Sequence, residues 1–257
     1  MRRLAIRPGG IGDFILSLPA LEFLAGPDLE IWTAGVNVPL IRFARARSIA
    51  ATGLNLLGVG EPPARLLEDL GGFDAIFSWY GSNRPEFREL VGRLGLPFTF
   101  FPALPPEGDG RHAADFYLDQ VGAPRGASPR IECRVERGRF AVIHPFSGSP
   151  RKNWPLEKFR ALAARLERHL PVEWCAGRDD PALPGAVRID DLYQLACWLA
   201  QAALYIGNDS GITHLAAAAG TPVLALFGPT DPEVWGPRGD HVRIARWHDL
   251  EFPRMGA

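Results

Sequence analysis

Short apolar runs alternate with amphipathic helical patterns along this 257-residue chain. The apolar runs have the length and composition of buried strands, and parallel strands need a helical crossover between them. The alternation therefore predicts βαβ units, a parallel sheet and an α/β fold. The expected strands are 3–7, 29–33, 74–78, 140–144, 172–176, 204–206 and 223–227, and the expected helices are 14–25, 63–70, 112–121, 155–170, 192–203 and 212–219.

A stretch dense in Gly, Pro and Arg interrupts this rhythm between residues 122 and 139. It lacks apolar periodicity, which is typical of a linker. We therefore expect two domains, residues 1–136 and residues 137–257, each close to the usual size of a domain.

The charges of the chain are nearly balanced, with 28 basic and 29 acidic residues and a formal net charge of -1. Such a chain has no overall field to collect nucleic acid or an anionic membrane, so we expect no nucleic-acid partner. Hydrophobic residues make up 47% of the chain, which is typical of a folded soluble protein. No run of 18 apolar residues occurs, and we expect no membrane span.

The cysteines predict a reducing compartment. Cys133, Cys175 and Cys197 are odd in number and show no C-x-x-C spacing, so we expect free thiols in a cytoplasmic protein. Pro19 and Glu22 interrupt the first apolar run, and we expect no secretory signal there.

Three glycine-rich turns between an expected strand and an expected helix carry the chemistry. The first holds Gly9, Gly10, Gly12 and Asp13. It differs from a dinucleotide fingerprint because the third glycine would fall on Ile15, which disfavours a Rossmann oxidoreductase or epimerase. Taken alone, Asp13 is best interpreted as a helix N-cap.

The second turn follows the expected strand 140–144 and contains Ser147, Gly148, Ser149 and Lys152. Small polar residues and a cation at a helix entry are what phosphate oxygens require. A solvated loop can have the same composition.

The third turn contains Asp209, Ser210, Gly211, Thr213 and His214 and leads into an alanine-rich helix. The first N–H groups of that helix form an anion site. A purely structural role explains the glycine and the alanines but not the aspartate and the histidine.

In this order and at this spacing, the motifs resemble glycosyltransferase family 9, the heptosyltransferase family. The resemblance covers most of the chain and is more specific in its second half. It rests on Gly12-Asp13 with Pro19, His144-Pro145, Lys152-Asn153-Trp154-Pro155, Asp209-Ser210-Gly211 with His214, Gly220-Thr221-Pro222 and Phe227-Gly228-Pro229-Thr230-Asp231-Pro232.

The resemblance implies a GT-B architecture, in which two Rossmann-like parallel-sheet domains face one another across a cleft. Residues 1–136 would hold the acceptor, and residues 137–257 would hold a nucleotide-sugar. The family suggests ADP-heptose as the donor and a lipopolysaccharide core or another glycan, free or lipid-linked, as the acceptor. The residues themselves do not distinguish adenine from uracil or guanine. We expect a bacterial, cytoplasmic enzyme with at most peripheral contact with the inner membrane surface.

The resemblance also implies inverting transfer, with Asp13 as the general base on the acceptor-side loop of Gly9, Gly10 and Gly12. Lys152 and the start of the third-turn helix would meet the charge of the leaving group. The members of the predicted nucleotide-sugar site are Ser147, Gly148, Ser149, Lys152, Asp209, Ser210, Gly211, Thr213 and His214.

We expect neither a metal nor another cofactor, because the chain lacks the Asp-x-Asp spacing of metal-dependent glycosyltransferases. The adjacent pairs at 179–180 and 190–191 are interpreted as solvated turns.

An alternative interpretation is a shortened member of the family that binds nucleotide without transferring a sugar. The chain is shorter than usual for the family, and its last residues show no convincing helix. The presence of Asp13, Lys152 and the complete third motif favours the enzyme.

Overall fold

The computed structural model describes residues 1–58, 60 and 62–250. It divides into two compact units, Met1–Ala127 and Ser128–Ala257. The division at 127/128 falls within the expected linker of residues 122–139, whereas the sequence placed the boundary at 136/137.

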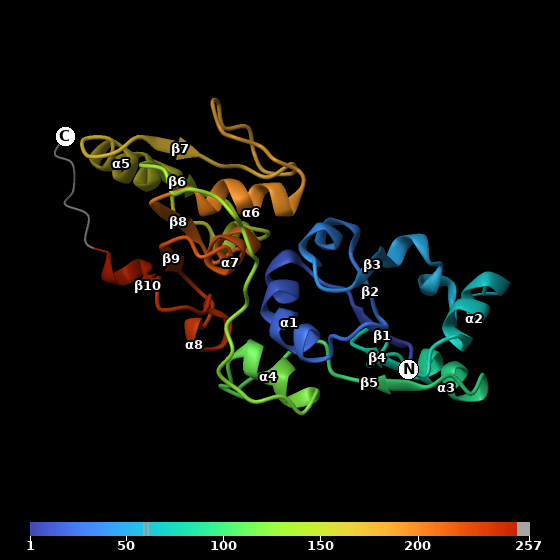
Figure 1. The fold of residues 1–257 in the computed structure, drawn as a ribbon. Coiled ribbons are helices and arrows are strands. Elements are labelled where there is room, and N and C mark those ends of the chain that lie inside the picture. Colours follow the sequence, from blue (N-terminus) through green and yellow to red (C-terminus); the bar gives the residue numbers. More distant parts are fainter. Residues whose placement is uncertain (59, 61, 251–257) are drawn as a thin grey trace. The chain divides into compact units, whose positions relative to one another are not determined.

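The first unit contains a five-stranded parallel sheet in the order β3-β2-β1-β4-β5, shown from blue to green in Figure 1. This order matches the first five strands of the doubly wound Rossmann fold, in which the strand order reverses between β1 and β4. The strands are β1 (Arg3–Arg7), β2 (Leu29–Thr33), β3 (Arg45–Ser48), β4 (Ala75–Ser78) and β5 (Phe98–Phe100). The helices are α1 (Ile11–Phe23), α2 (Ala64–Gly71), α3 (Pro85–Arg93) and α4 (Ala113–Gln120), with 3-10 turns η1 (Gly35–Leu40), η2 (Ile49–Ala51) and η3 (Leu54–Leu56).

Alternation along β1 determines which face of the sheet each of its side chains reaches. Leu4 and Ile6 pack into the apolar cluster that includes Phe87 of α3. Because successive side chains of a strand point to opposite faces, Arg7 points to the other face, where Tyr117 of α4 lies.

The second unit contains a parallel sheet in the order β10-β9-β8-β6-β7. This is the other common doubly wound order, in which the strand order reverses at β6: β7 lies on one side of β6, and β8, β9 and β10 follow on the other. The strands are β6 (Ala141–His144), β7 (Val172–Trp174), β8 (Leu204–Asn208), β9 (Val223–Phe227) and β10 (Val242–Arg246). The helices are α5 (Leu156–Leu166), α6 (Leu192–Ala200), α7 (Gly211–Ala218) and α8 (Pro232–Trp235), with 3-10 turns η4 (Pro150–Lys152) and η5 (Trp247–Asp249).

The predicted α/β fold with two parallel sheets is confirmed, and all seven expected strands are present. The sequence did not predict β3, β5 and β10. All three are edge strands, and β3 and β10 also contain arginines. An edge strand is covered incompletely, so its sequence need not be a continuous apolar run.

Helix boundaries differ from expectation by three or four residues at one end of α1, α5 and α6, and α6 ends at Ala200 rather than at residue 203. Helix α1 begins at Ile11 rather than at Phe14, because glycine at position 12 is tolerated in a first helical turn. Helix α5 ends at Leu166, and the expected continuation to residue 170 is a tight turn in which the His169 N–H donates to the Leu166 carbonyl at 2.8 Å.

Within the described part of the chain, no helix combines the length and the apolar character needed to cross a bilayer. The expected lack of a last helix concerns in part residues 251–257, which lie outside the described residues.

Candidate functional site

The site in the second unit lies where the strand order reverses. Parallel strands place their carboxyl ends at one edge of the sheet, and the loops that follow β6 and β8 diverge there. These two loops carry the residues that the sequence assigned to nucleotide-sugar binding.

Asn208, the last residue of β8, holds the two loops together. Its fully buried side chain donates from Nδ2 to the Pro145 carbonyl at 2.8 Å and accepts the Trp154 N–H at Oδ1 at 2.9 Å. Sequence reasoning did not single out Asn208. The available signal was its position between a buried strand and Asp209.

Lys152 and Asp209 form an ion pair that joins the second and third motifs. The Lys152 Nζ lies 2.8 Å from Asp209 Oδ2, and the Thr230 hydroxyl donates to the same oxygen at 2.6 Å. The Asp209 side chain is 6% exposed, whereas that of Lys152 is 34% exposed. A buried carboxylate therefore orients an ammonium group that solutes can still reach.

Helix α7 starts beside this pair. Ser210 is its N-cap and accepts the Thr213 N–H at Oγ at 3.3 Å. The fully buried Thr213 hydroxyl donates to the Asn208 carbonyl and lies 3.2 Å from the Tyr205 hydroxyl. Burial raises the pKa of Tyr205, so this phenol remains neutral. The Thr213 side chain thus ties the start of α7 to β8. The first backbone N–H groups of α7 are the donors suited to an anion.

The other predicted residues of this site shape its loops. The Ser147 hydroxyl lies 2.8 Å from the Ser149 carbonyl and 2.7 Å from Asn153 Oδ1, which closes the turn after β6. Gly148 is exposed, and a Cβ at this position would meet no atom within 4 Å. His214 is buried within α7, with 5% of its surface exposed.

The interpretation of Asp180 as part of a solvated turn is wrong. Its Oδ2 lies 3.0 Å from the Nε2 of the buried His144 and accepts the Gly177 N–H at 2.6 Å. Burial by itself would raise the pKa of Asp180, but these two hydrogen bonds and the nearby Arg188 lower it below its usual range. A fixed carboxylate thus stands after β7, at the same sheet edge.

Among the described residues, no group of three or more His, Cys, Asp or Glu side chains is arranged to hold a metal ion.

The glycine loop of the first unit, residues 8–10, joins β1 to α1. Gly9 has a φ of 134°, in the region that favours glycine. Gly10 is the N-cap of α1, with extended backbone angles and no capping side chain. Asp13 lies in the first helical turn, so its interpretation as the N-cap is wrong. Its Oδ2 lies 3.8 Å from where a Cβ on Gly10 would stand, close to the helix start that favours an anion.

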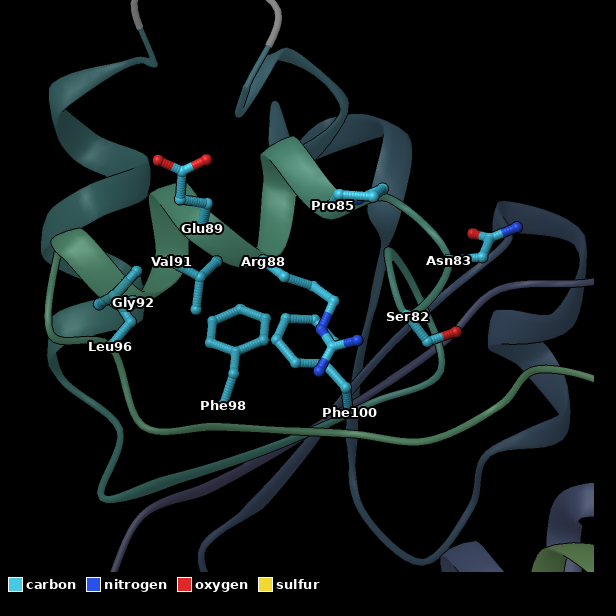
Figure 2. A pocket seen from close by; sticks show the side chains of 10 residues that line it. All are labelled: Ser82, Asn83, Pro85, Arg88, Glu89, Val91, Gly92, Leu96, Phe98 and Phe100. Atoms are coloured by element: carbon cyan, nitrogen blue, oxygen red, sulfur yellow. The ribbon is translucent and has the colours of Figure 1, made fainter.

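A cavity of about 590 Å³ between α3 and β5 contains none of the predicted site residues. Figure 2 shows Phe98 and Phe100 along the strand and Arg88 on the helix, and the Arg88 guanidinium lies 5.5 Å from the centre of the Phe100 ring. The residues that line the cavity are Ser82, Asn83, Pro85, Arg88, Glu89, Val91, Gly92, Leu96, Phe98 and Phe100.

Comparison with known proteins places the chain among glycosyltransferases. It is 30% identical over 123 residues to lipooligosaccharide heptosyltransferase 2 of Haemophilus influenzae, covering 41% of this chain and 36% of that protein. It is 38% identical over 143 residues to lipopolysaccharide heptosyltransferase 3 of Escherichia coli K12, covering 45% of this chain and 41% of that protein. The chain thus spans about two fifths of the length of the curated relatives it matches.

Solved structures share the fold. The E. coli heptosyltransferase WaaC with ADP aligns with a TM-score of 0.66 and 19% identity, covering 96% of this chain and 93% of that one. A family 9 glycosyl transferase from Veillonella parvula aligns with a TM-score of 0.74 and 21% identity, covering 96% and 86%.

The family model for glycosyltransferase family 9 (heptosyltransferase) matches residues 112–255. That match includes more than half of the chain and all residues predicted at the second-unit site. The chain belongs to glycosyltransferase family 9.

Proposed function

We propose that this chain is a metal-independent, inverting glycosyltransferase that moves heptose from ADP-heptose to a hydroxyl of a lipopolysaccharide core or another glycan. The observation that carries the proposal is the Lys152–Asp209 pair beside the start of α7, at the sheet edge where the strand order reverses. The names of the curated relatives support lipopolysaccharide as the acceptor class, and a solved relative is described with ADP.

The second unit, predicted as residues 137–257, would hold the nucleotide-sugar. Its diphosphate is dianionic, and Lys152 together with the first N–H groups of α7 supplies positive charge for it. The same groups would stabilise the ADP that departs with the bonding electrons, which is the part of the reaction where negative charge develops. Asp209 keeps the ammonium in place between turnovers. The remaining proposed contacts come from Ser147, Gly148, Ser149, Ser210, Gly211, Thr213 and His214.

The first unit, predicted as residues 1–136, would hold the acceptor at the loop of Gly9, Gly10 and Gly12. The acceptor oxygen forms a bond to the anomeric carbon from the face opposite the diphosphate while the bond to the diphosphate breaks. Asp13 takes the proton that the acceptor hydroxyl loses. In this proposal the protein acts on the cytoplasmic side, with at most peripheral contact with the inner membrane surface.

Calorimetry with ADP tests the nucleotide site. Lys152→Ala removes one charge-assisted interaction of about 1.5–3 kcal/mol, so its Kd for ADP should rise roughly 10- to 100-fold. The chain offers a matched control in Lys158, its only other lysine. Lys158 is an exposed residue of α5 whose ammonium group lies over the Trp154 ring. Lys158→Ala should bind ADP like the unchanged protein. Equal affinity in both variants would remove Lys152 from the site.

A transfer assay tests the reaction itself. ADP-heptose and deacylated lipopolysaccharide core saccharide are incubated with the protein, and release of ADP and the mass gain of the saccharide are followed. We expect the same rate with and without EDTA. A rate that collapses in EDTA and returns with Mg²⁺ would refute metal independence. Tight ADP binding without any transfer would favour the nucleotide-binding protein instead.

A further inference from the structure

The Arg7 side chain is a charged group buried beneath the glycine loop, and neither the motifs nor the proposed reaction gives it a role. We propose that Arg7 is a positioning residue for Asp13, joining the glycine loop to the first turn of α1 and placing a fixed positive charge beside the carboxylate. This inference rests on the proposed function, in which Asp13 is the general base.

The guanidinium joins the first residue of the loop to the first turn of α1. Its Nη1 donates to the Pro8 carbonyl at 2.8 Å, and its Nη2 donates to the Asp13 carbonyl at 3.0 Å. Arg7 is 1% exposed and its guanidinium lies 4.6 Å from the centre of the Tyr117 ring of α4. A planar, rigid group with two donors and a stacking partner fixes both backbone segments in one geometry.

A second side chain holds the middle of the loop. Asn37 of η1 is fully buried and donates from Nδ2 to the Gly9 carbonyl at 3.2 Å. The side chains that bond the loop therefore come from β1 and from the turn after β2, and Tyr117 of α4 packs against the first of them. In the described structure the Arg7 Nε and the Asn37 Oδ1 are buried without a hydrogen-bond partner. Each such atom costs about 1–3 kcal/mol, so stability alone does not account for this arrangement.

The charge of Arg7 also acts on Asp13. Burial lowers the pKa of Arg7, whereas Tyr117 of α4 and the Asp13 carboxylate of α1 oppose that shift. Burial raises the pKa of Tyr117 to about 12, so the phenol is neutral and contributes no anion near neutral pH. Asp13 is then the anion that compensates the buried cation. The attraction is mutual, so Arg7 favours the ionised Asp13 that proton abstraction requires.

Kinetics of charge variants provide the first test. Arg7→Met and Arg7→Gln remove the charge, and Arg7→Lys retains it without the two-donor geometry. We expect the neutral variants to lose roughly 10- to 100-fold in kcat with little change in the donor KM, since small displacements of a reacting group have effects of this size. Arg7→Lys should recover part of the loss. Arg2→Met is the matched control, because Arg2 also stacks on a ring, that of Phe73 at 4.8 Å, and bonds a backbone carbonyl.

Carboxylate titration by ¹³C NMR provides a test that does not depend on turnover. The Asp13 signal is assigned by its loss in Asp13→Asn, and its midpoint should rise by roughly one pH unit or more in the neutral variants and stay near the original value in Arg7→Lys. If Arg7→Met does not fold, Arg7→Gln decides the question. A neutral variant with an unchanged midpoint and unchanged kcat would overturn the inference. An unchanged protein without transfer activity would refute the proposed function, while the titration would still decide whether Arg7 acts on Asp13.

Discussion

Asp13→Asn separates a structural from a chemical role of the first-turn carboxylate, because the two roles predict losses of turnover of very different size. Gly10 is the N-cap, so Asp13 stabilises α1 through its charge near the helix start and near Arg7 rather than as a cap. A charge in such a partly buried position contributes about 0.3–2 kcal/mol. At roughly 2–4 °C per kcal/mol for a chain of this size, asparagine should lower Tm by at most about 8 °C.

That loss cannot reduce activity appreciably. If the protein is stable by about 5–15 kcal/mol, as domains usually are, losing 2 kcal/mol leaves more than about 99% of it folded. A missing general base, by contrast, lowers turnover by about 10²- to 10⁴-fold, which corresponds to roughly 3–5 kcal/mol in the barrier. We therefore expect Asp13→Asn to bind ADP normally and to lose turnover far beyond its loss of folded protein.

The assay measures ADP release from ADP-heptose with acceptor present, together with Tm and ADP affinity on the same samples. Glu86→Gln is the matched control, because Glu86 is also an acidic residue in the first turn of a helix of the first unit. Its Tm should change by a similar or smaller amount and its turnover should not change. Full turnover in Asp13→Asn would refute the assignment of Asp13 as the base.

Two further predictions concern the second unit. Because the pKa of folded Asp180 lies below its usual range near 3.9, the carboxylate stabilises the fold above that pH and the stabilisation disappears as the pH falls through the lower folded value. Urea unfolding should show that Asp180→Asn is less stable than the unchanged protein at pH 7 and that the difference shrinks below about pH 4; a difference that does not depend on pH, or an equal effect of exposed Asp179→Asn, would contradict this. Gly228→Ala should lose about 1–3 kcal/mol in the same measurement, because the new Cβ would stand 2.5 Å from Cη2 of the Trp247 ring. Gly148→Ala, with open space around its Cβ, should be near neutral, and equal stabilities of the two variants would show that the ring moves aside.

The two-sheet α/β fold and the neighbourhood of the predicted nucleotide site could both be predicted from the amino-acid sequence. Both are recorded locally, because a buried strand such as Val223–Phe227 is a continuous apolar run and a helix entry such as Ser210–Thr213 has its own residue pattern. The motif of Lys152 and that of Asp209 could be recognised separately for the same reason. Boundaries were less certain where a residue suits both a turn and a helix, as Gly12 does.

Which of these groups come into contact could not be predicted from local patterns and follows from the packing of the fold. The Lys152–Asp209 pair and the His144–Asp180 contact join segments at the carboxyl ends of neighbouring strands, and these strands are neighbours only because the strand order is β8-β6-β7. Likewise, Arg7 reaches Tyr117 because its position in β1 faces α4. Local patterns fix the periodicity and the ends of elements, whereas strand order and the packing of helices on each face depend on the burial of the whole core. For this reason the sequence predicted a solvated Asp180, whereas in the fold its carboxylate contacts His144 and accepts the Gly177 N–H.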